Sequence, residues 1–250
     1  MAFSLPSGLK ITYLGHSTLY MTLPNGKTIL VDPWTYGNPR CPNDFKNIES
    51  ADLMLITHGH DDHAGDALPI AEKTGCTIVC MFELMNVYVA QGVPSEKFQP
   101  MNKGGSVRLD EFGITVTMTH ALHSASTGSV DGERFPIYTG EPAGFVVTLH
   151  DSGFAFYLAG DTAVFSDMRL IAELYQPKLA FLPIGDRFTM GPREAAYATK
   201  FLPGVEAVVP IHYATFPLLS GTPEAFADEL AKIGSGVESL VFQPGETKGT

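Results

Sequence analysis

A short run of metal-binding side chains constrains the fold of this chain more than any other feature. The apolar segment 51–57 is followed directly by the six residues His-Gly-His-Asp-Asp-His at 58–63. In extended backbone, side chains two residues apart point the same way, so His58 and His60 can hold one ion together. The segment therefore predicts a buried strand that ends in a metal-binding loop.

The other two candidate ligands of this loop lie where the chain is expected to turn into a helix. Asp62 and His63 precede the stretch 65–73, so they can face a second ion beside the first. The alternative is a polar loop that holds no metal. Histidine accounts for 8 of 250 residues, and three of the eight fall within this six-residue window, which favours the metal-binding interpretation.

Composition indicates a well-packed globular chain. With 44% hydrophobic and 17% charged residues, the 250 residues suit a single domain over 1–250. A net charge of −11 argues against a nucleic-acid partner, which usually requires a basic face. The sequence also contains no apolar run that approaches the length needed to span a bilayer. We therefore expect a cytoplasmic protein that uses neither a nucleic acid nor a membrane as its partner.

The cysteines do not suggest a disulfide framework. Cys41, Cys76 and Cys80 are an odd, sparse set without a C-x-x-C pair. Cys76 and Cys80 flank the probable strand 77–79. We expect free thiols that pack inside the protein.

The order of predicted elements indicates an α/β (α+β) fold. Helices alternate with strands after an antiparallel opening, and the second half repeats the pattern of the first, so we expect one domain made of two β-rich halves covered by helices. The predicted strands are 9–14, 18–23, 28–32, 51–57, 77–81, 113–119, 144–149, 154–159, 179–184 and 207–211; the predicted helices are 65–74, 82–91, 166–174, 192–201 and 223–233.

Three further ligand candidates each follow a predicted strand. They are His123, Asp161 and His212, and strand ends at a common sheet edge are where rigid scaffolds place functional side chains. The complete set gives His58, His60 and His123 for one ion and Asp62, His63 and His212 for the other. Asp161 can then bridge the two. Such a site holds two divalent ions roughly 3.5–4 Å apart with a hydroxide between them.

The order of these motifs resembles the metallo-β-lactamase-fold superfamily of hydrolases. The order is His-x-His-x-Asp-His, then His, then Gly-Asp-Thr, then a late His, and the resemblance covers essentially the whole chain. It implies a four-layer αβ/βα sandwich with the metals at one edge of the sheets. It also implies that Asp161 bridges the ions and that Asp32 supports the site from behind the ligands.

Three shorter segments indicate a particular group within this superfamily. The stretches 13–18 (Tyr-Leu-Gly-His-Ser-Thr), 121–124 (Ala-Leu-His-Ser) and 183–192 are similar to small cytoplasmic metal-dependent hydrolases related to L-ascorbate-6-phosphate lactonase. The resemblance implies a small lactone or other ester, with or without a phosphate group, as the substrate.

Several residues have two interpretations. The His-Ser pair favours His123 over His120 as the ligand. His16 either contacts a substrate carboxylate or phosphate or has a hydrogen-bonded structural role. Asp32 either fixes the tautomer of a histidine ligand or merely ends a strand before a turn. For Asp186 and Arg187, a solvated loop is the expected position, with a substrate contact as the alternative.

The chemistry that this set predicts is metal-assisted hydrolysis. Two divalent ions generate a hydroxide near neutral pH, and Asp62 is the catalytic residue that orients it and carries the proton to the leaving group. Zinc is expected first, with manganese, iron or nickel as alternatives. The competing functions are a phosphodiesterase, a di-iron redox protein and a non-catalytic metal-binding protein. A homo-oligomer is compatible with the sequence.

Overall fold

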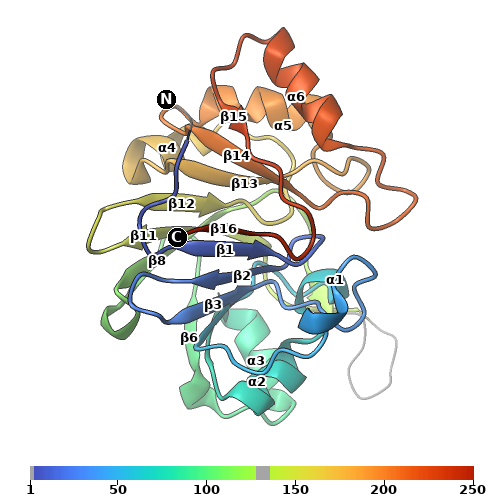
Figure 1. Cartoon of the computed structure of the whole chain (residues 1–250). Helices are drawn as coiled ribbons and strands as arrows, with labels where there is room; N and C mark the ends of the chain where they lie inside the picture. The colour runs from blue at the N-terminus through green and yellow to red at the C-terminus, as the bar shows by residue number, and fades with distance from the viewer. Residues whose placement is uncertain (1–2, 128–135) are drawn as a thin grey trace.

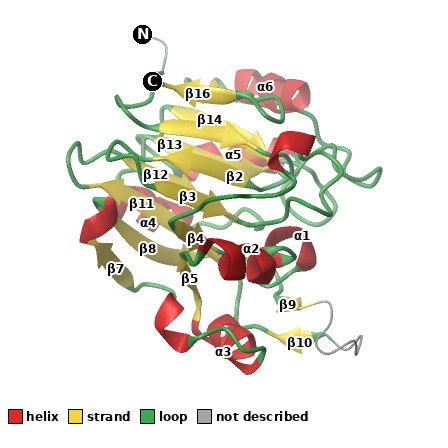
Figure 2. Cartoon of the chain, turned by 60° about the horizontal axis from the view of Figure 1, so that its bottom comes forward, coloured by secondary structure: helices red, strands yellow, loops and turns green. Residues whose placement is uncertain are grey.

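Two seven-stranded mixed sheets form the centre of the protein in a computed structural model that describes residues 3–127 and 136–250. Helices α1, α2 and α3 lie together on one side of the strands, and α4, α5 and α6 lie on the other (Figure 1). Figure 2 shows the strands gathered between these two groups of helices. The expected four-layer αβ/βα sandwich is thereby confirmed.

The first sheet is antiparallel at one end and parallel at the other. From β16 to β3 the neighbouring strands run antiparallel, and from β3 to β6 they run parallel. In spatial order the strands are β16 (Thr247–Gly249), β1 (Lys10–Tyr13), β2 (Leu19–Thr22), β3 (Thr28–Val31), β4 (Leu53–Leu55), β5 (Thr77–Met81) and β6 (Phe98–Met101).

The second sheet repeats this plan. Strands β7, β8, β11 and β12 run antiparallel to one another, and β12 to β15 run parallel. The spatial order is β15 (Glu238–Ser239), β14 (Ala207–Ile211), β13 (Leu179–Pro183), β12 (Ala155–Leu158), β11 (Ala143–Leu149), β8 (Ile114–His120) and β7 (Ser106–Leu109). A separate short pair consists of β9 (Ser126–Thr127) and β10 (Ile137–Tyr138).

The helices begin close to where the sequence predicts them. The Thr222 hydroxyl accepts the backbone N–H of Ala225 and so caps α6, with Pro223 in the first helical position. The α-helices are α1 (Asp61–Ala64), α2 (Ala67–Thr74), α3 (Phe82–Ala90), α4 (Met168–Tyr175), α5 (Pro192–Ala198) and α6 (Pro223–Lys232); the 3₁₀ helices are η1 (Asn43–Phe45), η2 (Ser95–Lys97), η3 (Asp110–Phe112) and η4 (Thr199–Phe201). Along the described chain, no helix is both long and apolar enough to cross a bilayer.

Two predictions need correction. The helix expected over 65–74 begins two residues later, at Ala67, because the N–H of Asp66 donates to the carbonyl of Pro33; a separate short helix, α1, covers Asp61–Ala64 in the ligand loop. The position of His150 in the turn between β11 and β12 predicts a solvated ring, but the ring is half-buried, and its Nε2 lies 3.0 Å from the Thr115 hydroxyl.

The two sheets share one apolar core. Buried side chains of both sheets belong to a single cluster, and all three cysteines are free and buried in it, as expected. The parallel strands β3, β4, β12 and β14 are buried along most of their length. This core fixes the positions at which those strands end, and the candidate site starts from there.

Candidate metal centre

Every predicted ligand follows the end of a strand, and the fold brings these ends together. His58 and His60 follow β4, and His63 lies in α1 directly after them. The other three come from the second sheet: His123 follows β8, Asp161 follows β12, and His212 follows β14. Ligands that are up to 154 positions apart in the sequence therefore meet at one edge of the sandwich.

The first group is formed by His58, His60 and His123. One ring nitrogen from each lies within 4.8 Å of the others. His58 Nε2 is 3.0 Å from His60 Nδ1, a contact between two ring nitrogens that can serve one ion. His120 lies apart, exposed to solvent, with Nδ1 3.1 Å from the Lys103 ammonium. The structure therefore places His123, and not His120, in the cluster.

The second group is formed by Asp62, His63 and His212, joined by His16. Their ligand atoms also lie within 4.8 Å of one another. His16 Nε2 is 3.2 Å from Asp62 Oδ2, and the centres of the His16 and His212 rings are 3.9 Å apart. In this group Asp62 is partly exposed, whereas the three histidines are buried. We grouped His16 apart from the ligands, but the fold places it among them.

Asp161 lies between the two groups. Its Oδ1 is 3.2 Å from His63 Nε2, and its Oδ2 is 3.1 Å from His212 Nε2 and 3.7 Å from His123 Nε2. Its side chain is almost fully buried. One carboxylate therefore contacts side chains that were assigned to different ions, which is the position a bridging ligand requires.

Asp32 supports histidines of both groups from behind. Its Oδ2 accepts from His63 Nδ1 at 2.8 Å and from the Thr57 hydroxyl at 2.9 Å. Because the Thr57 hydroxyl donates to Asp32, its oxygen accepts from His58 Nδ1, 3.0 Å away. Nδ1 of both rings is thus a hydrogen-bond donor, which leaves Nε2 as the nitrogen that faces the cluster and can bind a metal ion. The role of Thr57 leaves no signal in the sequence, because nothing in the motif distinguishes it from an ordinary strand residue.

The backbone at the site is strained. His16, Asp32 and His212 have positive φ values of 58°, 45° and 56°, a region that non-glycine residues rarely adopt. Such conformations persist where the surrounding structure over-determines them, often at functional sites. The hydrogen bond from the His212 N–H to the His16 carbonyl, 2.7 Å long, ties two of these residues together.

Burial keeps most of the histidine rings neutral. It lowers the pKa of His58 well below the usual value and lowers the pKa of His60 and His123. Burial, together with the neighbouring His212, lowers the pKa of His16 to about 4. A neutral ring is the form that binds a metal ion.

Carboxylates reverse this effect at one ring. Burial acts to lower the pKa of His63, but the charges of Asp161 and Asp32 outweigh it and raise that pKa well above the usual value. Burial likewise acts to raise the pKa of Asp161 and Asp62, yet the neighbouring histidines hold both pKa values below the ordinary range. The cluster therefore contains ionised carboxylates and attracts positive charge.

Unpaired polar atoms in the cluster indicate that it can hold a metal ion. His63 Nε2, both ring nitrogens of His212 and Asp161 Oδ1 are buried and have no partner in hydrogen-bonding geometry among the described residues, although some lie 3.1–3.2 Å apart. Buried polar atoms are rarely left unpaired. Imidazole and carboxylate donors at this spacing suit a divalent first-row ion.

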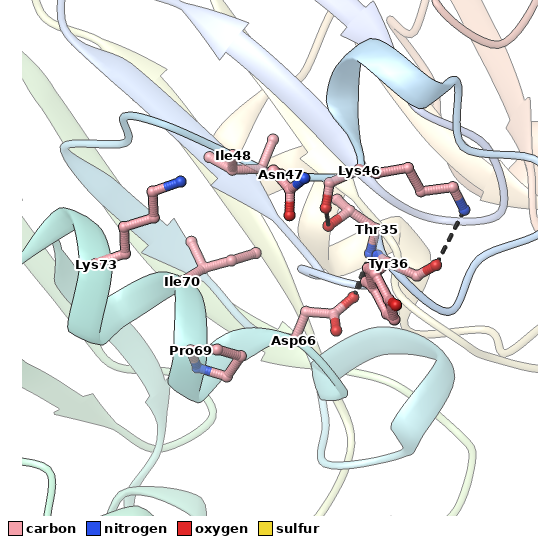
Figure 3. A pocket seen from close by; sticks show the side chains of 9 residues that line it. All are labelled: Thr35, Tyr36, Lys46, Asn47, Ile48, Asp66, Pro69, Ile70 and Lys73. Atoms are coloured by element: carbon pink, nitrogen blue, oxygen red, sulfur yellow. Dashed lines mark hydrogen bonds between the residues drawn. The ribbon is translucent and has the colours of Figure 1, made fainter.

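A separate cavity of about 310 Å³ lies beside the loop that follows β3 (Figure 3). Its charged side chains already have partners: Asp66 accepts the N–H groups of Thr35 and Tyr36, and Lys73 pairs with Glu49. None of its nine lining residues is a predicted ligand. The cavity is therefore not the site of the chemistry.

Comparisons with known proteins agree with this geometry. The model of the β-lactamase superfamily domain matches residues 27–213. A UPF0173 metal-dependent hydrolase from Rubrobacter xylanophilus is 49% identical over 250 residues, which cover 100% of both chains. The chain belongs to the β-lactamase superfamily of metal-dependent hydrolases. A superfamily relative from Koribacter versatilis is 45% identical, with 96% of this chain and 97% of the relative covered.

A similar solved structure agrees with this assignment. Igni18, a metallo hydrolase from the hyperthermophilic archaeon Ignicoccus hospitalis, superposes with a TM-score of 0.81 and 36% identity. The match covers 96% of this chain and 97% of Igni18. The superfamily assignment makes this protein a metal-dependent hydrolase and confirms the predicted fold. Asp186 and Arg187 lie on an exposed loop, the position expected for them, and Asp186 accepts a hydrogen bond from the Ser220 hydroxyl.

Proposed function

We propose that the protein hydrolyses a small lactone or ester, with or without a phosphate group, at a dinuclear metal site. The position of Asp161 is the observation that carries this proposal. Its two carboxylate oxygens lie within 3.7 Å of histidines from both groups, so the groups share one ligand. A single ion would leave donors of the other group buried without a partner.

We assign His58, His60 and His123 to one ion, Asp62, His63 and His212 to the other, and Asp161 to both. When bound, two divalent ions supply a hydroxide near neutral pH and polarise the bond that is cleaved. Asp32 and Thr57 keep the rings of His58 and His63 in the tautomer that binds metal, as their hydrogen bonds indicate.

We assign the catalytic proton transfer to Asp62. Among the carboxylates of the cluster, Asp62 is 31% exposed, whereas Asp161 is 3% exposed. Asp62 can therefore meet both the nucleophile and a substrate that enters from solvent. Its low pKa favours the ionised form, which can accept a hydrogen bond from the nucleophile, take up that proton as the nucleophile attacks, and return the same proton to the leaving oxygen.

Zinc is our first assignment for the metal. The donors in the cluster are imidazoles and carboxylates, a set that also accepts manganese, iron or nickel. We further propose a small-molecule substrate, with no nucleic acid or membrane as partner, in a cytoplasmic protein that is compatible with homo-oligomer formation. The net charge of −11 supports this proposal.

Metal analysis combined with a substrate panel tests the proposal. Elemental analysis of the purified protein should give two divalent ions per chain, and chelation should abolish hydrolysis of simple lactones until metal is returned. His60→Ala should lose activity, whereas the matched variant His120→Ala should retain it. Hydrolysis of a bis-phosphodiester without hydrolysis of any lactone would instead assign the protein as a phosphodiesterase. A protein that retains turnover without metal would contradict the proposal.

A further inference from the structure

His16 lies among the proposed ligands although it belongs to none of the motifs that identify them. It is in the turn between β1 and β2, and its side chain is fully buried. A buried imidazole must satisfy both ring nitrogens. Where those two nitrogens point decides what the residue does.

The backbone of His16 is fixed by two hydrogen bonds to its carbonyl oxygen. One comes from the Tyr13 hydroxyl at 3.0 Å, and the other comes from the N–H of His212 at 2.7 Å. Together they hold His16 in its positive-φ conformation beside a proposed ligand. The ring of His16 is thus positioned by the same strand end that positions His212.

Thr215 fixes the first ring nitrogen. His16 Nδ1 is 2.9 Å from the Thr215 hydroxyl oxygen, and that hydroxyl donates to the carbonyl of Tyr213 at 3.2 Å. A hydroxyl has a single hydrogen, so once it is given to Tyr213 the oxygen must accept from Nδ1–H of His16. In a neutral ring, Nε2 then carries a lone pair.

The lone pair of Nε2 points at another acceptor. Nε2 lies 3.2 Å from Asp62 Oδ2, which is long for a charge-assisted N–H···O bond of about 2.7–2.9 Å. Neighbouring ligand atoms about 2.0–2.1 Å from one zinc ion lie roughly 2.8–3.4 Å from each other, whether four or more ligands surround it. The His212–Asp161 contact has nearly the same length, 3.1 Å. The spacing is that of two ligands of one ion.

We propose that His16 binds the ion of the second group through Nε2, with Thr215 setting the tautomer of its ring. This inference rests on the dinuclear site proposed above. The second group then supplies five protein donors and the first supplies four, each count including Asp161. The two ions should consequently bind with different affinities, with the tighter one in the second group.

The competing role is a hydrogen bond from His16 Nε2–H that merely orients Asp62. In that arrangement the Thr215 hydroxyl would donate to Nδ1 and not to Tyr213. Glutamine distinguishes the two roles because its amide N–H₂ can donate to Asp62, whereas an amide is a poor ligand for zinc. His16→Gln should still bind both ions if His16 only donates a hydrogen bond to Asp62. It should not if His16 itself is a metal ligand.

The test is a Zn²⁺ titration of chelator-treated protein by calorimetry. Wild type should bind two ions, and His16→Gln should lose one or bind it at least 100-fold more weakly, with the other ion unchanged. Thr215→Val should lower the affinity for the same ion roughly 10- to 100-fold, as expected when a residue that hydrogen-bonds to a metal ligand is lost. The matched control His120→Gln should bind both ions as wild type does.

Two outcomes separate this inference from the proposed function. If wild type binds both ions and His16→Gln does so equally well, His16 is not a ligand while the dinuclear site stands. If wild type binds fewer than two ions, the dinuclear site itself fails. Should His16→Gln not fold, a crystal structure of the zinc-loaded wild type decides: a Nε2–Zn distance near 2.1 Å supports the inference, and one beyond 3 Å overturns it.

Discussion

The two ligand groups differ in how they are enclosed. In the first group His58 is buried, but His60 and His123 are only half-buried. In the second group, His16, His63 and His212 are all buried, and Asp62 alone is partly exposed. The first group thus faces solvent with two of its three rings, and the second with a single carboxylate.

The side chains behind the ligands differ in the same way. Asp32 contacts His63 directly and reaches His58 only through Thr57. One buried carboxylate thus organises both groups, while the second group is the more completely enclosed. We therefore expect the ion of the first group to exchange more readily and to lie on the side that meets the substrate.

The largest effect is expected from Asp161→Ala, because this residue serves both groups. Both ions should be lost, and turnover should fall by roughly a thousandfold or more, since the nucleophile depends on them. Elemental analysis and kcat/KM measurements check this, with the exposed Asp151→Ala as control. A variant that still holds one ion firmly would show that the groups are independent.

A single-group loss is expected from His123→Ala. The affinity for the ion of the first group should fall by more than roughly 100-fold, which is the upper loss typical when a residue that only hydrogen-bonds to a ligand is removed. The second ion should stay bound. His120→Ala should change neither affinity, because that ring lies outside the cluster. Equal effects of the two variants in a metal titration would contradict the placement of His123.

Thr57→Val should have a smaller effect that is again confined to the first group. It removes the hydroxyl through which Asp32 fixes the ring of His58, so the affinity of that ion should fall roughly 10- to 100-fold. Thr57→Ser keeps the hydroxyl and should bind like wild type. If the second ion weakened equally, Thr57 would act on both groups and the asymmetry would be wrong.

The smallest effect concerns the stability of the metal-free protein in mild acid. Burial lowers the pKa of His16 to about 4 and also lowers the pKa of His58, His60 and His123, so these rings take up protons at a lower pH in the fold than in the unfolded chain. The free energy of unfolding should therefore fall as the pH drops from about 6.5 to about 4.

His63 acts in the opposite direction, because its pKa is raised and its contribution is present at low pH and lost as the pH rises. Because four rings have lowered pKa values and one has a raised pKa value, we expect a net loss of stability in acid. Thermal unfolding in the presence of a chelator, at pH 7 and at pH 4.5, measures it. A melting temperature that rose in acid would mean that His63 dominates the cluster.

The central strands and the ligand loop follow from the sequence alone. Buried strands such as β5 and β14 occupy the predicted residues, because a run of apolar side chains is stable only in the core of the protein. The strands that were missed are the edges of the two sheets, β6, β7, β15 and β16, and the short separate pair β9 and β10. Edge strands are short and polar, and β6 even contains Pro100, so their side chains carry no signal of burial.

The sequence by itself therefore determined the element order, the metal-binding motif and the class of hydrolase to which the chain belongs. The sequence also favoured His123 over His120 and a bridging role for Asp161, but only the tertiary structure supplied the distances between these residues and brought His16 and Thr215 to the second group. The reason is physical: a local pattern records which face of a strand is buried, but distances between residues far apart in the chain arise only when both sheets pack on one core.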